Sequence, residues 1–195
     1  EAVRALARTL ILSGIGMTLC GGSHPASQGE HLISHYLDMR SPLGRAGYLH
    51  GEQVAVATLT MARIQETMLA GTAPALAATA VDLPALQQHF GAELGTECWH
   101  DFAPKRLDSE RARALSASAQ AKWPALVEQA NAVRIPSSQL ATVMRRAGGP
   151  TAPADIGADP AFYWGAVGHA RYLRDRFTFL DLAGDAGLLE GQLFS

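Results

Sequence analysis

The sequence is short of several residue types, and each shortage excludes a class of protein. Sixteen basic side chains against eighteen acidic ones give a formal net charge of −2. Because a nucleic-acid-binding surface needs clustered lysine and arginine, this balance argues against nucleic acid as a partner. The two cysteines, Cys20 and Cys98, have no spacing typical of a disulfide framework. We therefore expect a reducing compartment, the cytoplasm, and two buried packing cysteines.

Long apolar runs are also missing. The longest charge-free run near the start, from Thr9 to Gly22, has fourteen residues, whereas a membrane-spanning helix needs about twenty. The segment also lacks a basic leader with a cleavage site. We therefore expect no membrane span and interpret this run as part of a core helix. The chain opens directly in helical periodicity without an initiator methionine, which indicates a fragment or a start that was removed.

Helical patterning is abundant. Apolar residues on one face predict a first helix that ends at the Gly21-Gly22 pair. A second helix carries the histidines discussed below and ends before Ser41-Pro42, since the residue before proline disfavours a helix. After a loop at 43–47, apolar residues at steps of three and four predict a third helix that ends at Gly71. This core stripe consists of Val54, Ala57, Met61, Ile64 and Met68.

Capping residues indicate the later helices. The expected caps and the helices that follow them are Asp82 with 83–90, Ser109 with 110–123, Ser137 or Ser138 with 139–149, and Asp159 with 160–176. The segment 148–157 reads as a loop. Residues 176–183 alternate as a strand would, but a lone strand has no partner, so we expect helix or extended coil. The sequence predicts one all-α domain over residues 1–195, a helical bundle.

Three histidines could carry chemistry. His31 and His35 are four residues apart and share a helix face. His50 lies at the start of the next predicted helix, so an antiparallel pair of helices would bring it back near His31. Two converging neutral imidazoles suit borderline divalent ions such as Zn²⁺ or Ni²⁺. The alternative is that each histidine is an ordinary capping or core residue.

A third metal ligand is not evident in the sequence. Catalytic metal sites usually have three protein ligands. Glu30 and Glu52 each stand directly beside a histidine, and adjacent helical residues point about 100° apart, so they rarely bind the same ion. Asp38 shares the face of His31 but lies two turns away. The chain therefore does not visibly complete a metal site.

Two stretches of the chain resemble a known family. GSHPASQGEHLISHYLD (22–38), followed by LHGEQVAVATL (49–59), is similar to the metal-binding segment of sn-glycerol-1-phosphate dehydrogenases. These enzymes share a superfamily with polyol dehydrogenases, iron-containing alcohol dehydrogenases and dehydroquinate synthases. The segment 154–183 resembles their closing helix and its R-D-R-[FY]-T-[FI]-L-D signature, so the likeness spans essentially the whole chain. It implies the helical C-terminal domain of a dehydroquinate synthase-like fold.

The resemblance implies a metal site shared with a second domain. Family members hold a divalent ion, here Zn²⁺, Ni²⁺ or iron, with two histidines and an aspartate. His31 and His50 are then the implied metal ligands, and the aspartate lies upstream of Glu1. An α/β domain that binds NAD or NADP is also implied upstream, and no G-x-G-x-x-G loop occurs in this chain.

The resemblance also implies the substrate side of the site. His35 is implied as the catalytic residue facing the substrate, with Ser27 and His24 as further substrate-binding residues. His24 stands where the family has an arginine, and Gln28-Gly29 stands where it has Gly-Ser. Because arginine binds phosphate through a fixed fork, the change at His24 bears on the preference for a phosphorylated substrate. The overall likeness still favours such a substrate.

Three functions follow as hypotheses. The leading one is an oxidoreductase, a homo-oligomer that reduces dihydroxyacetone phosphate to sn-glycerol 1-phosphate with NAD(P)H, in which this chain alone is inactive. A sister hypothesis is a glycerol or other polyol dehydrogenase acting on free substrate. A hypothesis of a different class is a non-catalytic helical interaction module. An upstream reading frame for an α/β domain would favour the enzyme, and a stop codon just before Glu1 would favour the module.

Overall fold

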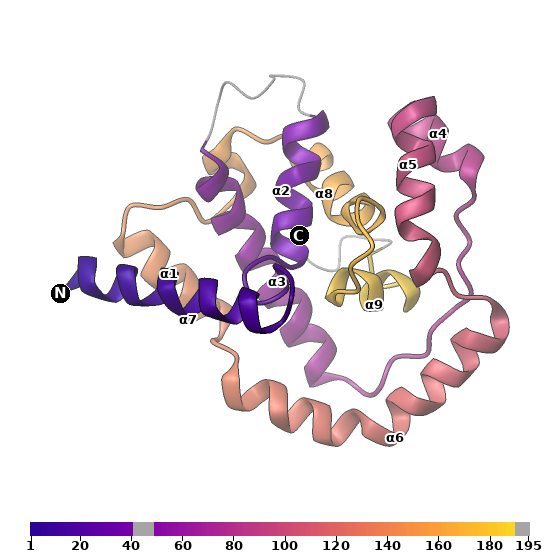
Figure 1. Ribbon diagram of the computed structural model, residues 1–195, viewed down its shortest axis with the longest axis horizontal. Helices are drawn as coiled ribbons and strands as arrows, with labels where there is room; N and C mark the ends of the chain where they lie inside the picture. The colour runs from indigo at the N-terminus through magenta and orange to yellow at the C-terminus, as the bar shows by residue number, and fades with distance from the viewer. Residues whose placement is uncertain (41–48, 190–195) are drawn as a thin grey trace.

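Every regular element of the described chain is helical. The computed structural model describes residues 1–40 and 49–189, and within those ranges it contains no strand (Figure 1). The predicted all-α fold class is therefore confirmed. The predicted loop at 43–47 and the predicted stop at Ser41-Pro42 lie outside the described residues.

The core forms around two neighbouring helices, with two later ones packed against them (Figure 1). Four residues of the predicted apolar stripe are buried and Val54 is half-buried, because the steps of three and four keep them on one helix face. Thr60 and Tyr163 share a buried hydrogen bond of 2.7 Å between their hydroxyl groups. These core helices are α2 (Gly29–Arg40), α3 (His50–Ala70), α8 (Pro160–His169) and α9 (Phe179–Asp185).

Helices α4 (Leu83–Phe90) and α5 (Ala92–Phe102) form a tight pair. Asp82 caps α4 as expected, since its carboxylate accepts a hydrogen bond of 2.9 Å from the Ala85 amide. Gly91 joins the two helices with a φ of +94°, a conformation that favours glycine. The sequence patterns did not indicate α5.

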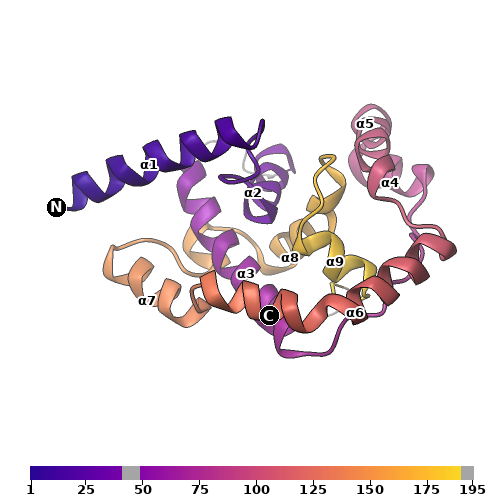
Figure 2. The same cartoon turned by 60° about the horizontal axis from the view of Figure 1, so that its bottom comes forward.

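Two predicted caps need correction. Helix α6 (Ser109–Val133) is capped by Asp108 rather than Ser109, because the Asp108 carboxylate accepts a hydrogen bond of 2.8 Å from the Arg111 amide. Helix α7 (Ser137–Arg146) has no side-chain cap. Ser137 instead donates from its amide and its hydroxyl to Glu66 of α3, at 2.7 and 2.6 Å. A tertiary contact thus replaces the local one. Both helices lie at the periphery of the molecule (Figure 2).

The closing part of the chain is more broken than its sequence indicates. Asp159 caps α8 as expected, accepting from the Phe162 amide at 3.0 Å, but α8 ends at His169 and a short 3₁₀ turn η4 (Ala170–Tyr172) follows. The stretch at 176–183 contains no strand. Instead, Thr178 accepts a hydrogen bond from the Leu180 amide, and α9 begins directly after it. The loop at 148–157 contains the 3₁₀ turns η3 (Pro153–Ile156). A further 3₁₀ turn, η2 (Ala103–Lys105), follows α5.

Helix α1 (Ala2–Leu19) contradicts the expectation of a core helix. It extends to one side of the body and has no buried residue (Figures 1 and 2). The prediction was wrong because apolar periodicity indicates a helix with an apolar face. It does not show that a described element packs against that face. The predicted end at Gly21 is confirmed by its φ of +63°. The exposed apolar side chains are Val3, Leu6, Leu10, Ile11, Leu12, Ile15 and Leu19.

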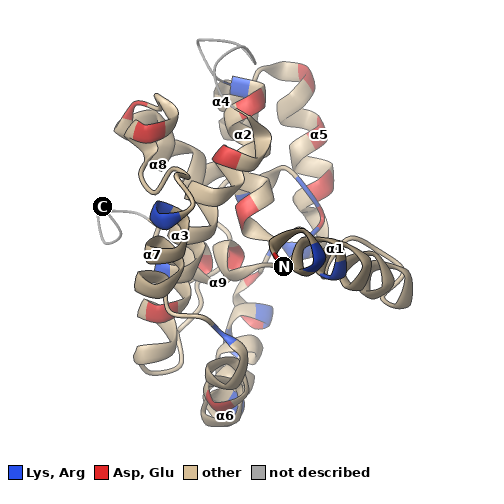
Figure 3. Cartoon of the chain, turned by 90° about the vertical axis from the view of Figure 1, so that its left-hand side faces the viewer, with Lys and Arg blue, Asp and Glu red and all other residues tan. Residues whose placement is uncertain are grey.

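Two further sequence expectations concern α1 and the cysteines: the absence of a membrane span and the burial of Cys20 and Cys98. Its eighteen residues are long and apolar enough to cross a membrane by length and composition alone, although Arg4 and Arg8 lie on it (Figure 3). A helix covered by other protein has the same composition. Cys20, just after α1, is exposed rather than buried, whereas Cys98 is buried as expected. Burial, together with nearby carboxylates, raises the pKa of the Cys98 thiol to about 11.

Candidate functional site

The structure brings His31 and His50 together. Helices α2 and α3 are neighbours, and Ser34 of α2 contacts both His50 and Gln53 in the first turn of α3. The ring centroids of His31 and His50 lie 5.4 Å apart, with the ring planes tilted by 58°. The two histidines are nineteen positions apart in the sequence, so the return of the chain between α2 and α3 creates this pair.

His35 completes a triangle of imidazoles. Its ring centroid lies 6.4 Å from that of His31 and 5.9 Å from that of His50. Burial lowers the pKa of His35, and the neighbouring His50, Arg174 and His31 lower it further, while Asp38 acts in the opposite direction. His35 therefore tends to remain neutral beside the other two rings.

The separation of His31 and His50 suits a shared ion. Two imidazoles that bind one tetrahedral ion through nitrogens about 2.0–2.1 Å from it place their ring centroids about 5 Å apart. The observed 5.4 Å matches that requirement. Within residues 1–40 and 49–189, however, no three side chains of His, Cys, Asp or Glu are placed to hold a metal ion. The separation of the pair suits two ligands of one ion, and no third ligand accompanies them in the described ranges.

The glutamates beside the two histidines have other partners. Glu30 Oε1 lies 3.0 Å from His31 Nδ1 and also accepts a hydrogen bond of 2.8 Å from the Gln28 amide. Glu52 Oε2 accepts a hydrogen bond of 3.0 Å from the Leu49 amide and so caps the start of α3. Both carboxylates are therefore held by the chain around the histidines.

A cavity of about 490 Å³ opens beside His35. Ser23, Ser27 and His35 line it from the N-terminal part of the chain, and Arg174 and Arg176 line it from the C-terminal part. The cavity thus combines an imidazole, two hydroxyl groups and two guanidinium groups. The remaining lining residues are Leu32, Asp101 and Asp175.

His24 lies apart from this cavity. Its side chain is exposed and it is not among the lining residues, while its backbone carbonyl accepts a hydrogen bond from the Gln28 side chain. Of the three expected substrate-side residues, the structure therefore places Ser27 and His35 on one cavity and His24 outside it.

Arg176 joins the two walls of the cavity. It donates to the Ser27 carbonyl oxygen and, at 2.7 Å, to the Ser23 hydroxyl. The partners are about 150 positions apart in the sequence, so their spacing gave no sign of this contact. The available signal was the R-D-R-F-T-F-L-D stretch at 174–181, to whose arginines the family resemblance assigned no role.

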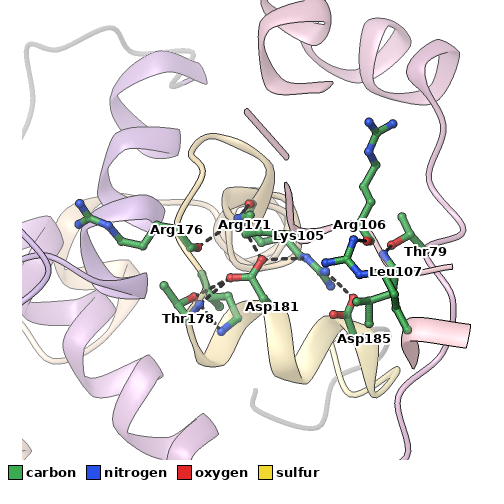
Figure 4. A network of polar contacts seen from close by, with 11 residues as sticks. Thr79, Lys105, Arg106, Leu107, Arg171, Arg176, Thr178, Asp181 and Asp185 are labelled. Atoms are coloured by element: carbon green, nitrogen blue, oxygen red, sulfur yellow. Dashed lines mark hydrogen bonds and ion pairs between the residues drawn. The ribbon is translucent and has the colours of Figure 1, made fainter. Parts of the chain in front are cut away.

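The arginine wall of the cavity is the segment 171–176, which carries Arg174 and Arg176. A buried network of ions holds this segment in place (Figure 4). Lys105 Nζ donates to the carbonyl oxygens of Arg171 and Arg176, at 2.6 and 3.1 Å, and lies 3.0 Å from Asp181 Oδ1. Arg171 pairs with Asp185. Because Lys105 binds the carbonyl groups at both ends of 171–176, it fixes the segment that carries Arg174 and Arg176.

Burial shifts two members of this network. It lowers the pKa of the Lys105 ammonium, although Asp181 acts to raise it. It raises the pKa of the Asp185 carboxyl, although Arg171 acts to lower it. Asp181 itself is fully buried. Each charge in the network therefore depends on its partners, because a buried charge without a partner is costly.

The fold and the site together define an all-helical domain that presents a histidine pair beside an arginine-lined cavity. Over 99% of its length, the chain is 26% identical to glycerol-1-phosphate dehydrogenase (NAD(P)+) of Bacillus licheniformis. It is 49% identical over 61 residues to the enzyme of the same name from Staphylothermus marinus, and 41% identical over 85 residues to that from Pyrococcus furiosus. The resemblance to glycerol-1-phosphate dehydrogenases is therefore confirmed.

These relatives are much longer than the region they share with this chain. The alignment covers 37% of the Bacillus licheniformis protein, 16% of the Staphylothermus marinus protein and 24% of the Pyrococcus furiosus protein. No family model matches the chain. No solved structure matches it either.

Proposed function

We propose that this chain is the helical metal- and substrate-binding part of an NAD(P)-dependent glycerol-1-phosphate dehydrogenase. The observation that carries the proposal is the convergence of His31 and His50 at 5.4 Å, next to His35 and a cavity lined by two arginines. The similarity to enzymes of that name over 99% of the chain supports it. An NAD(P)-binding α/β domain and the third metal ligand, an aspartate, are proposed to lie before Glu1.

The metal site is proposed to contain His31 and His50 of this chain. A divalent ion there, Zn²⁺, Ni²⁺ or iron, would supply Lewis-acid polarisation of a ketone oxygen and stabilise its developing negative charge. Imidazole nitrogen suits all three metals. The role of the chain itself is to hold the two imidazoles at a fixed separation and to bind the substrate alongside them.

The cavity is proposed to bind the substrate, dihydroxyacetone phosphate. Arg174 and Arg176 can bind a phosphate group through charge-assisted hydrogen bonds. The Arg174 guanidinium has no hydrogen bond or ion pair with any residue of the described ranges, so it is available to a ligand. His35 lines the cavity together with the arginines and also neighbours the histidine pair, so its imidazole can donate or accept a proton near the reacting carbon. These positions favour a phosphorylated substrate over a free polyol.

Titration of the chain with Zn²⁺ tests the metal site. Wild-type protein is expected to bind one ion with modest affinity, and His31→Ala is expected to lose that binding because one of the two ligands is gone. His100→Ala, on α5, is the matched control and should bind as the wild type does. Equal affinity of wild type and His31→Ala would contradict the proposed site.

Activity separates the proposed enzyme from its alternatives. The chain alone is expected to show no dehydrogenase activity, and joined to the upstream coding sequence of its gene it is expected to oxidise NAD(P)H with dihydroxyacetone phosphate. Dihydroxyacetone without phosphate should be a poor substrate, and a preference for it would favour a polyol dehydrogenase. An upstream stop codon would favour a non-catalytic module. Assembly as a homo-oligomer and a cytoplasmic location stay predictions.

A further inference from the structure

Two sets of hydrogen bonds reach the Nδ1 atoms of the histidine pair, His31 and His50. Ser34 is fully buried and its hydroxyl group contacts two side chains at once. The Ser34 Oγ atom lies 3.0 Å from His50 Nδ1 and donates a hydrogen bond of 2.7 Å to Gln53 Oε1. A hydroxyl group has one hydrogen to donate, so this contact leaves only its lone pairs for His50.

The direction of the Ser34 hydrogen bond bears on which nitrogen of His50 carries hydrogen. Since Ser34 offers a lone pair, His50 Nδ1 must be the donor, which leaves the lone pair of its imidazole on Nε2. Asp38 Oδ2 lies 3.9 Å from the same Nδ1 atom and, when ionised, is also an acceptor. The opposite tautomer would direct an imidazole lone pair at a carboxylate, so both neighbours favour the same form.

His31 is held in the same form by a different group. Its Nδ1 atom lies 3.0 Å from Glu30 Oε1. That oxygen is fixed in place, because it also accepts a hydrogen bond of 2.8 Å from the Gln28 amide. An ionised carboxylate can only accept, so His31 Nδ1 carries hydrogen and Nε2 keeps the lone pair.

We infer that Ser34 with Gln53, and Glu30 with the Gln28 amide, are positioning residues that set both imidazoles as Nε2 ligands. The inference rests on the proposed function, in which the two rings share one divalent ion. A carboxylate or other acceptor behind a metal-binding imidazole fixes its tautomer and orientation and raises its basicity. Here each ring has such a group, and the group is in place before any ion binds.

Gln53 is the residue that directs the hydrogen of the Ser34 hydroxyl away from His50. Without an acceptor at Gln53 Oε1, the Ser34 hydroxyl is free to rotate and donate to His50, which would reverse the tautomer. Gln53→Met removes the acceptor at similar size, and Gln53→Glu keeps it. Ser34→Ala removes the hydroxyl group itself. Thr58→Val is the matched control, because it deletes another hydroxyl of α3, one that bonds only the Val54 carbonyl oxygen.

Nitrogen NMR of the metal-free chain reads the tautomers directly. Long-range ¹H–¹⁵N spectra, recorded at a pH where both rings are neutral, are expected to show hydrogen on Nδ1 of His31 and of His50. Ser34→Ala and Gln53→Met should shift His50 toward the other tautomer and leave His31 unchanged. Gln53→Glu and Thr58→Val should match the wild type. Hydrogen on Nε2 of His50 in the wild type would overturn the inference.

Zn²⁺ affinity then tests whether the tautomer matters for binding. Loss of such a supporting group typically costs about 10- to 100-fold in metal affinity. Ser34→Ala and Gln53→Met are therefore expected to bind Zn²⁺ at least about tenfold more weakly than Thr58→Val and Gln53→Glu, with helical circular dichroism spectra confirming that all four fold. Wild-type affinity in Ser34→Ala would overturn this inference alone. Absence of Zn²⁺ binding by the wild type would instead overturn the proposed function, and the NMR result would stand separately.

Discussion

The molecule contains two pairs of adjacent histidines, and they differ in how their rings meet. His31 and His50 have ring centroids 5.4 Å apart and planes tilted by 58°. His89 and His169 are closer, with centroids 3.7 Å apart and planes within 4° of parallel. The closer pair is the poorer candidate for a metal site, because stacked rings direct their nitrogens side by side rather than toward one point.

The nitrogens of the stacked pair also have structural partners. His89 Nε2 lies 2.8 Å from the Tyr36 hydroxyl, and His169 Nδ1 lies 2.8 Å from the Gly165 carbonyl oxygen. Burial, with His169 and Arg40 nearby, lowers the pKa of His89 to about 4. These two histidines serve as packing groups between α2, α4 and α8. Proximity alone therefore does not make a metal site. A metal site also requires that the free lone pairs of the histidine nitrogens point toward one position.

The largest expected effect is on the buried network of ions around Asp181. Asp181→Asn removes the charge that faces Lys105 in the buried network, which anchors the chain between His169 and the cavity. A buried ammonium without its partner costs about 3–5 kcal/mol, so the free energy of unfolding is expected to fall by that amount. Denaturant unfolding followed by circular dichroism measures it.

A surface carboxylate is the control for that experiment. Glu128→Gln, on the exposed side of α6, should leave the unfolding midpoint unchanged. If Asp181→Asn were as stable as this control, the buried network would not be what holds the arginine wall.

Local signals explain what the sequence could predict. Asp82 and Asp159 were recognisable as caps because a cap acts on amides two or three residues away. The apolar stripe of α3 was recognisable because its spacing alone fixes one face. His31 and His50 required only one short return of the chain, so their meeting could be expected from the helix order.

The features that sequence analysis missed are long-range contacts. Arg176 reaches Ser23 and Ser27 across about 150 positions, and no local spacing encodes that contact. Ser137 bonds Glu66 of another helix instead of capping its own. Helix α1 failed in the opposite way, because its apolar pattern correctly predicted a helix, but no element of the described residues buries its apolar face.

The second prediction concerns pH and sharpens the contrast between the pairs. The pKa of His89 is about 4 in the folded state and about 6.5 when unfolded, so folding favours the neutral ring. Its contribution to stability is full above about pH 6.5 and is lost as the pH falls toward 4. Because the ring is partly exposed, we expect a loss on the order of 1 kcal/mol.

His89→Gln isolates this contribution. It keeps a hydrogen-bonding group near Tyr36 but cannot titrate, so its unfolding free energy should vary less between pH 6.5 and 4.5 than that of the wild type. His24→Gln, at an exposed position, should follow the wild-type curve. Parallel curves for His89→Gln and wild type would show that the stacked pair does not respond to protonation.

The smallest expected effect on stability belongs to the candidate metal pair. Half of the His50 side chain is exposed, at 49%, and its ring contacts the core mainly through Ser34. His50→Ala should therefore change the free energy of unfolding by about 0.5 kcal/mol or less in the absence of metal, as surface substitutions do. Zn²⁺ should distinguish the stability of the wild type from that of His50→Ala, because an ion that binds only the folded state stabilises it by mass action. Thermal unfolding with and without excess Zn²⁺ should show a raised midpoint for the wild type and for His89→Gln, and none for His50→Ala. A raised midpoint in His50→Ala together with none in His89→Gln would reverse the roles assigned to the two pairs.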